Sequence, residues 1–107
     1  MTTQELKTIL ESITGFSNKV AYFVWESNVP ALPYICFFTP SSNSFSADNI
    51  TYHQSKNFRI ELYTKRKDEA TEKLVEDKLT YYDIYFTKES DYLEDEKCWM
   101  TLYEITL

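Results

Sequence analysis

Glycine is scarce in this chain, which has one glycine, one histidine, two cysteines and three prolines among 107 residues. With a single glycine it has neither GxGxxG nor GxxxxGK[ST], in which repeated glycines let a backbone loop approach phosphate groups. The low glycine and proline counts also exclude a collagen-like or linker-like composition. The sequence therefore excludes these nucleotide-binding loops and favours a folded domain.

The single histidine restricts the possible catalytic designs. His53 lies in a polar stretch, TYHQSKN, with no second histidine or cysteine at metal-ligand spacing. The serines of residues 40–49 lack the GxSxG pattern of a nucleophile. Paired carboxylates occur at Asp68-Glu69 and at 94–96, but nothing in the sequence places them in a cleft. We therefore predict no enzyme, no cofactor and no metal site, with a small enzyme whose site forms between subunits as the weaker alternative.

Long apolar runs are also missing. No run approaches the roughly 18 residues needed to cross a bilayer, and the N-terminal residues lack the basic start and apolar stretch of a signal peptide. We expect a chain that is made and kept in the cytosol, without a membrane partner. Cys36 and Cys98 lie in apolar, strand-like contexts, and a reducing compartment predicts two free, buried thiols.

Acidic side chains outnumber basic ones, 17 to 11, which gives a net charge of −6 and a pI near 4.7. Nucleic-acid binders neutralise phosphate with basic residues, so this balance disfavours DNA or RNA as a specific partner. Acidic residues gather between 89 and 96. Because that run lacks the alternating ligands and the glycine of a calcium loop, a solvated surface is the simplest interpretation.

The first predicted helix has a start signal and an end signal. Thr2 and Glu5 have capping-box spacing, and Gly15 stands where a C-cap needs a positive φ. Between the two signals, apolar side chains recur at helical spacing and predict one buried face of the helix: Leu6, Ile9, Leu10 and Ile13.

The rest of the chain predicts strands and one further helix. The helix begins after Asp68 and continues to about Leu79, while residues 40–49, PSSNSFSADN, predict a loop. The order α-β-β-β-α-β-β predicts one α+β domain, residues 1–107, with a mainly antiparallel sheet and both helices on one face. The inner side of the helix is predicted as Ala70, Leu74, Val75 and Leu79, and the strands as 20–25, 34–39, 58–64, 84–87 and 98–107.

Aromatic residues are abundant, with nine Tyr, seven Phe and two Trp, or 17% of the chain. A domain of this size buries only about two-thirds of its unfolded surface and cannot hide all of these rings. Since Tyr and Trp are enriched at protein interfaces, the surplus predicts self-association. The alternative to self-association is a core rich in aromatic side chains, with scattered tyrosines exposed on the surface. The rings expected to be exposed are Tyr22, Trp25, Tyr63, Trp99 and Tyr103.

Four stretches carry a resemblance to a known family: LPYI at 32–35, FSADNITYH at 45–53, FRIELYTKRKDEATEKLVEDKL at 58–79 and IYFTKESDYLEDEKCWMTLYEI at 84–105. They resemble small structural proteins encoded in the morphogenesis clusters of siphophages and prophages of low-GC Gram-positive bacteria. That family carries an IELYT-x-x-KD strand-to-helix passage and a closing YE strand. One departure is Ser46, where relatives often have glycine.

The resemblance implies a tail-completion protein, either a tail terminator or a head–tail joining protein. It implies a tail-terminator-like fold and a hexameric ring at the head-proximal end of the tail. The partners would be copies of itself, the major tail tube protein and head-completion or neck proteins, in a virion assembled in the host cytoplasm. Loop 40–50 would reach a neighbour or the tube. The candidate interface residues are Phe45, Asp48, Tyr63, Trp99 and Tyr103.

An acidic protein suits a channel that conducts DNA, because such a channel should repel phosphate rather than hold it. The alternative function is a soluble bacterial adaptor or regulatory protein-binding module that uses the same sheet surface for one host partner.

Overall fold

The computed structural model describes residues 2–25, 27–40 and 57–106. The described residues form two helices and five strands in the predicted order, and the predicted α+β class is confirmed. The elements are α1 (Thr3–Glu11), β1 (Val20–Tyr22), β2 (Tyr34–Phe38), β3 (Asn57–Thr64), α2 (Glu69–Tyr81), β4 (Phe86–Leu93) and β5 (Cys98–Thr106).

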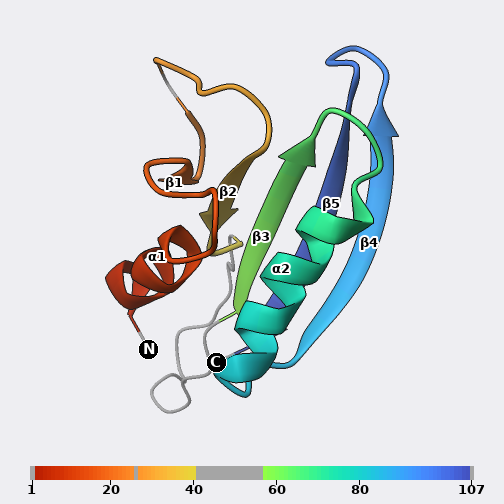
Figure 1. Ribbon diagram of the computed structural model, residues 1–107. Coiled ribbons are helices and arrows are strands. Elements are labelled where there is room, and N and C mark those ends of the chain that lie inside the picture. The colour runs from red at the N-terminus through yellow and green to blue at the C-terminus, as the bar shows by residue number, and fades with distance from the viewer. Residues whose placement is uncertain (1, 26, 41–56, 107) are drawn as a thin grey trace, which may run out of the picture.

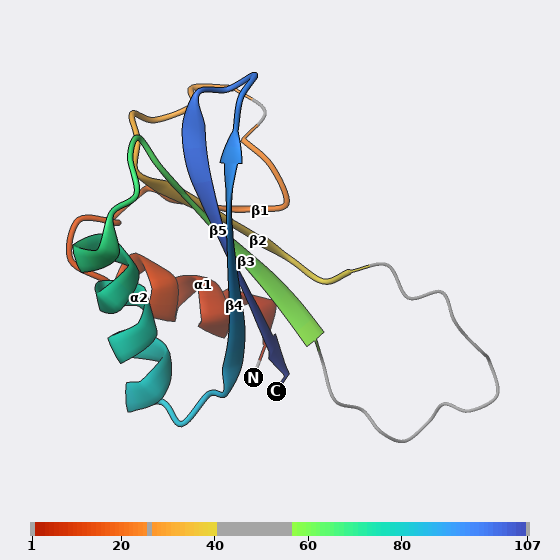
Figure 2. The same cartoon turned by 90° about the vertical axis from the view of Figure 1, so that its right-hand side faces the viewer.

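The strands of the described chain form one sheet in the order β1-β2-β3-β5-β4. β1 pairs with β2 in parallel, and the other neighbouring pairs are antiparallel. β3 is the central strand and pairs with β5 along its whole length, from Asn57↔Thr106 to Thr64↔Trp99. Both helices lie on one face of the sheet, as predicted, with α1 beside β1 and β2 and α2 across β3, β5 and β4 (Figure 1, Figure 2). We call the opposite face the outer face.

The start of α1 is as predicted, but its end is not. The Thr2 side chain accepts from the Glu5 N–H at 3.1 Å, and the Thr2 N–H donates to the Glu5 carboxylate at 2.8 Å. The helix ends at Glu11, with Ser12 rather than Gly15 as its C-cap. Gly15 instead has a φ of 91° in the turn that leads to β1. A positive φ is what glycine supplies there, so its conformation was predicted and its position relative to the helix was wrong.

The core lies between the helices and the inner face of the sheet. In β3 the side chains alternate, with Phe58, Ile60 and Leu62 buried against the helices and the intervening side chains on the outer face. The sequence shows this period of two because the side chains of β3 alternate between the helix-covered inner face and the more exposed outer face. Other core residues include Leu6, Leu10, Phe16, Val20, Ile35, Phe37, Val75, Leu79, Tyr103 and Ile105.

Two strands differ from the prediction. β1 ends at Tyr22 rather than at residue 25, because Phe23 has a φ of 72° and the extended chain cannot continue through that conformation. β4 begins at Phe86 and continues to Leu93, so Glu89 and Asp91 belong to a strand and not to the acidic connector. Charged side chains on an edge strand disfavour pairing with another sheet, and β4 is such an edge.

The inner side of α2 also needs a correction. Asp68 caps the helix as predicted, since its carboxylate accepts from the Thr71 N–H at 3.1 Å. Val75 and Leu79 are buried, but Ala70 is exposed and Leu74 is 41% exposed. The third buried position of the helix is Glu72. An apolar stripe could not predict this face, because one of its members is a carboxylate.

The two cysteines are free and buried, as predicted. Burial, with a smaller contribution from the Glu61 charge, raises the pKa of the Cys36 thiol to about 11. Burial also raises the pKa of Cys98. Because the thiolate is the reactive form, neither thiol is a ready nucleophile at neutral pH.

Candidate functional site

Apart from Tyr92 on β4, the exposed large apolar side chains of the described chain lie at two separate places. The β1-side surface, on β1 and the segment after it, consists of Tyr22, Phe23, Val24 and Val29. The α2-end surface, on α2 and the corner that follows it, consists of Leu74, Tyr81, Tyr82 and Tyr85. Figure 1 shows these elements at opposite ends of the view, with β1 and its following segment at the upper left and the end of α2 at the bottom.

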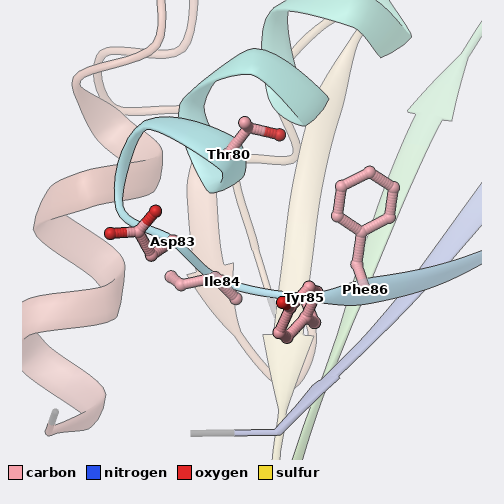
Figure 3. A pocket seen from close by; sticks show the side chains of 5 residues that line it. All are labelled: Thr80, Asp83, Ile84, Tyr85 and Phe86. Carbon is pink, nitrogen blue, oxygen red and sulfur yellow. The ribbon is translucent and has the colours of Figure 1, made fainter.

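The α2-end surface borders a pocket of about 500 Å³ (Figure 3). Thr80 stands on the last turn of α2, and the other lining residues follow on the segment that enters β4. The Tyr85 side chain is 91% exposed, whereas Phe86 turns inward and packs edge-on against Tyr103, with 5.5 Å between ring centroids. Ile84 and Phe86 give the recess an apolar floor, which suits an apolar side chain. Its lining is Thr80, Asp83, Ile84, Tyr85 and Phe86.

A second pocket, of about 280 Å³, opens beside the β1-side surface on the outer face of the sheet. Trp25, Tyr34 and Tyr63 form a row of rings there, with centroids 6.3 Å and 5.2 Å apart. The Tyr63 hydroxyl donates to the Glu61 carboxylate at 2.7 Å. We call this the outer-face pocket, and its lining is Phe23, Val24, Trp25, Val29, Tyr34, Cys36, Glu61, Tyr63, Leu93 and Glu96.

The titratable groups of the outer-face pocket lie in a negative environment. Burial raises the pKa of Tyr63, and the hydrogen bond to Glu61 and the charge of that carboxylate raise it further. Burial also raises the pKa of Tyr34, with smaller contributions from Cys36, Cys98 and Glu96. Burial, the largest cause of both shifts, disfavours a charge of either sign, and the smaller contributions of Glu61 and Glu96 disfavour a further negative charge. These two carboxylates, rather than the burial, therefore favour a cation over an anion in the pocket.

A buried ionic cluster connects α2 to the edge of the sheet. Glu72, whose side chain is 2% exposed, pairs with Lys67 at 2.6 Å and with Lys88 at 2.9 Å. Lys88 also pairs with Glu76 at 2.7 Å, and the Tyr103 hydroxyl donates to Glu76 at 2.9 Å. Burial acts to raise the pKa of Glu72, but the hydrogen bonds and charges of the two lysines outweigh it and hold the pKa below the usual glutamate value. The cluster has a structural role, because each charge already has a partner.

The structure separates the residues predicted as an interface. Tyr63 is half-buried in the outer-face pocket. Trp99 is half-buried on the opposite, helix-covered face, below Lys67. Tyr103 is completely buried under α2, so the prediction that it lies on an exposed face is wrong. Phe45 and Asp48 lie outside the described residues.

The α2-end surface was not predicted. A signal was present in the sequence, where YYDIY at 81–85 follows directly on the last turn of the predicted helix. Tyrosines at a helix end lie beyond the last buried position, Leu79, and need not pack in the core. Of the rings that were predicted to be exposed, Tyr22 is 47% exposed.

Comparison with protein-family models, curated proteins and solved structures finds no match for this chain. The resemblance to phage tail-completion proteins therefore stays a prediction. Neither α1 nor α2, the helices of the described chain, combines the length and the apolar character that crossing a bilayer requires. Within the described ranges, no group of three or more His, Cys, Asp or Glu side chains could hold a metal ion.

Replacing Glu72 with Gln should lower the free energy of unfolding at pH 7 by about 2 kcal/mol, because it removes the charged hydrogen bonds to two lysines that are 37% exposed, while Lys88 keeps its pair with Glu76. A carboxylate whose folded-state pKa is lowered contributes stability above its unfolded pKa, and this contribution is lost as the pH falls. The wild type should therefore lose stability below about pH 4.3, and Glu72→Gln should lack this part of the acid dependence. Urea unfolding followed by circular dichroism from pH 7 to pH 3 measures both effects.

The matched control is Asp77→Asn on the same helix, which removes the exposed Lys73–Asp77 pair. Its effect should stay within about 0.5 kcal/mol. Equal losses in the two variants would show that the buried cluster does not hold α2 on the sheet.

Proposed function

We propose that this protein is a non-enzymatic structural subunit of a phage tail or neck, either a tail terminator or a head–tail joining protein, and that its copies associate into a closed ring. The observation that carries the proposal is the presence of two different apolar surfaces at separate places on one subunit. A two-fold dimer uses the same patch on both partners. A ring needs two unlike patches, each of which contacts the other on the next subunit.

The edges of the sheet support this mode of association. β4 presents Lys88, Glu89 and Asp91 at one edge, which disfavours edge-to-edge pairing of strands. The opposite edge, β1, has only three residues, too few for a long ladder with another chain. Side-chain contacts between the two apolar surfaces are therefore the favoured way to join subunits.

The fold order and the charge also support the proposal. The α-β-β-β-α-β-β order, with both helices on one face, agrees with the tail-terminator-like architecture that the resemblance implied. The net charge of −6 disfavours retention of DNA in a ring that conducts it. Tyrosine is a suitable residue for such contacts, because it has an apolar ring and a polar tip.

Two variants, each with an acid on one surface, test whether the contacts join unlike patches. Phe23→Asp alters the β1-side surface, and Asp tolerates the left-handed backbone at this position. Tyr85→Asp alters the α2-end surface at a side chain that is 91% exposed. Each variant alone should stay monomeric in light scattering at concentrations where the wild type assembles. Their mixture should form a 1:1 dimer, because each retains the surface that the other lacks.

The control for this experiment is Tyr92→Asp, an exposed tyrosine on β4 that belongs to neither surface. It should assemble like the wild type. If the mixture of the two variants stays monomeric, or if either variant alone forms a dimer, the contact does not join these two surfaces.

The virion role needs a test in the phage or prophage whose genome encodes the chain. Mass spectrometry of purified particles should detect the protein. Inactivation of its gene should give heads and tails that do not join, or tails whose head-proximal end is not closed, in electron micrographs. A protein that is absent from the particles and is recovered with one host protein would contradict the proposal and favour the adaptor function.

A further inference from the structure

The outer-face pocket borders the β1-side surface, since Phe23, Val24 and Val29 belong to both. In Figure 2 the chain directly after β1 lies on the opposite side of the sheet from the two helices, before the segment crosses over the end of the sheet and enters β2. A subunit docked on the β1-side surface would therefore lie over the mouth of this pocket. The inference below rests on the proposed ring, and it concerns the side chain that enters the pocket.

The walls of the pocket match the chemistry of a cation. Aromatic faces attract lysine and arginine side chains when the charge lies within about 6 Å of a ring centroid. Trp25, Tyr34 and Tyr63 supply three such rings in one row. A volume of about 280 Å³ leaves room for one long side chain.

Two carboxylates in the pocket have no charged partner within the described chain. Glu61 and Glu96 line the pocket, yet neither forms an ion pair with a described lysine or arginine. From the described residues, the Glu61 side chain accepts a hydrogen bond from the Tyr63 hydroxyl. The raised pKa values of Tyr34, Tyr63 and Cys36 have acidic neighbours among their causes, in agreement with this uncompensated charge.

A lysine without an ion pair lies on the α2-end surface. Lys78, in the last turn of α2, lines a recess together with Leu74 and Tyr81. Its neighbour Asp77 pairs with Lys73 at 2.9 Å instead. The other described basic residues without an ion pair lie outside the α2-end surface: Lys19, Lys65, Arg66 and Lys97.

We propose that the outer-face pocket is a cation site for a second copy of this chain, and that Lys78 of the neighbouring subunit enters it beside Glu61 and Glu96. The apolar contacts between the two surfaces would exclude water around this pair. The pair would fix the orientation of the contact, because a rotated subunit would leave the carboxylates and the ammonium group unpaired. Charge complementarity thus adds specificity to an association that apolar area drives.

A charge exchange tests the source of the cation. Glu96 is exposed in the β4–β5 turn, so its reversal is less hazardous to folding than a reversal of half-buried Glu61. Glu96→Lys and Lys78→Glu should each weaken ring assembly at least fivefold, measured as the subunit concentration at half-assembly. The double variant should assemble at least threefold better than Lys78→Glu alone, because the introduced lysine and glutamate then pair across the contact. The recovery should stay partial, because Glu61 and the aromatic rings still line the pocket.

The matched control is Glu89→Lys, which changes an exposed glutamate of β4 outside the lining of the pocket. It should assemble normally alone and should not rescue Lys78→Glu. Assembly that is insensitive to Glu96→Lys and Lys78→Glu, or single losses without rescue in the double variant, would overturn the role of Lys78 while leaving the ring intact. A wild type that never assembles would instead overturn the proposed function.

A second measurement tests the pocket without assembly. Tyr85→Asp should leave the pocket open, and N-acetyl-lysine methylamide should shift the NMR signals of Trp25, Tyr34 and Tyr63 with saturation in the millimolar range. The analogue with an acetylated Nζ atom has no charge and should bind at least tenfold more weakly, and Glu61→Gln should weaken binding of the charged ligand. Equal binding of the two ligands, or shifts that do not saturate, would overturn the cation site itself.

Discussion

Both helices of the described chain lie on one face of the sheet, and this one-sided cover is the constraint on which the other features depend. The outer face must be shielded by its own side chains, by the segment after β1, or by another protein. Tyr34, Tyr63 and Cys36 are half-buried or buried there without any helix above them. The same one-sided cover leaves a carboxylate, Glu61, next to aromatic rings. It also leaves a pocket on the outer face, where helices packed on that face would have formed a second core.

The position of α2 across the sheet depends on a charge rather than on apolar packing alone. Glu72 faces β4 and β5 because Lys67 and Lys88 meet it there, and Val75 and Leu79 follow it on the same side of the helix. With these three positions turned inward, Leu74 is turned outward and the helix ends with Tyr81 and Tyr82 in solvent. The buried cluster and the α2-end surface are thus two consequences of one helix orientation.

The sequence predicted the class, the order of elements and the alternation of β3, because these depend on local signals such as caps and hydrophobic period. It did not predict the early end of β1, which depends on one left-handed residue, Phe23. The burial of Tyr103 also escaped prediction, since its strand has apolar side chains in both alternating sets and only α2 decides which set is covered. The outer-face pocket brings together residues from β2, β3, the β4–β5 turn and the segment after β1, which no spacing in the sequence connects.

The central claim is that two unlike apolar surfaces join copies of this chain into a closed ring. Native mass spectrometry of the wild type, from micromolar to millimolar concentration, tests it most directly. The account predicts the 12.7 kDa monomer and a closed species at six times that mass, with few intermediates, because only closure covers both surfaces of every subunit. A dimer as the largest species, or a monomer at every concentration, would contradict it.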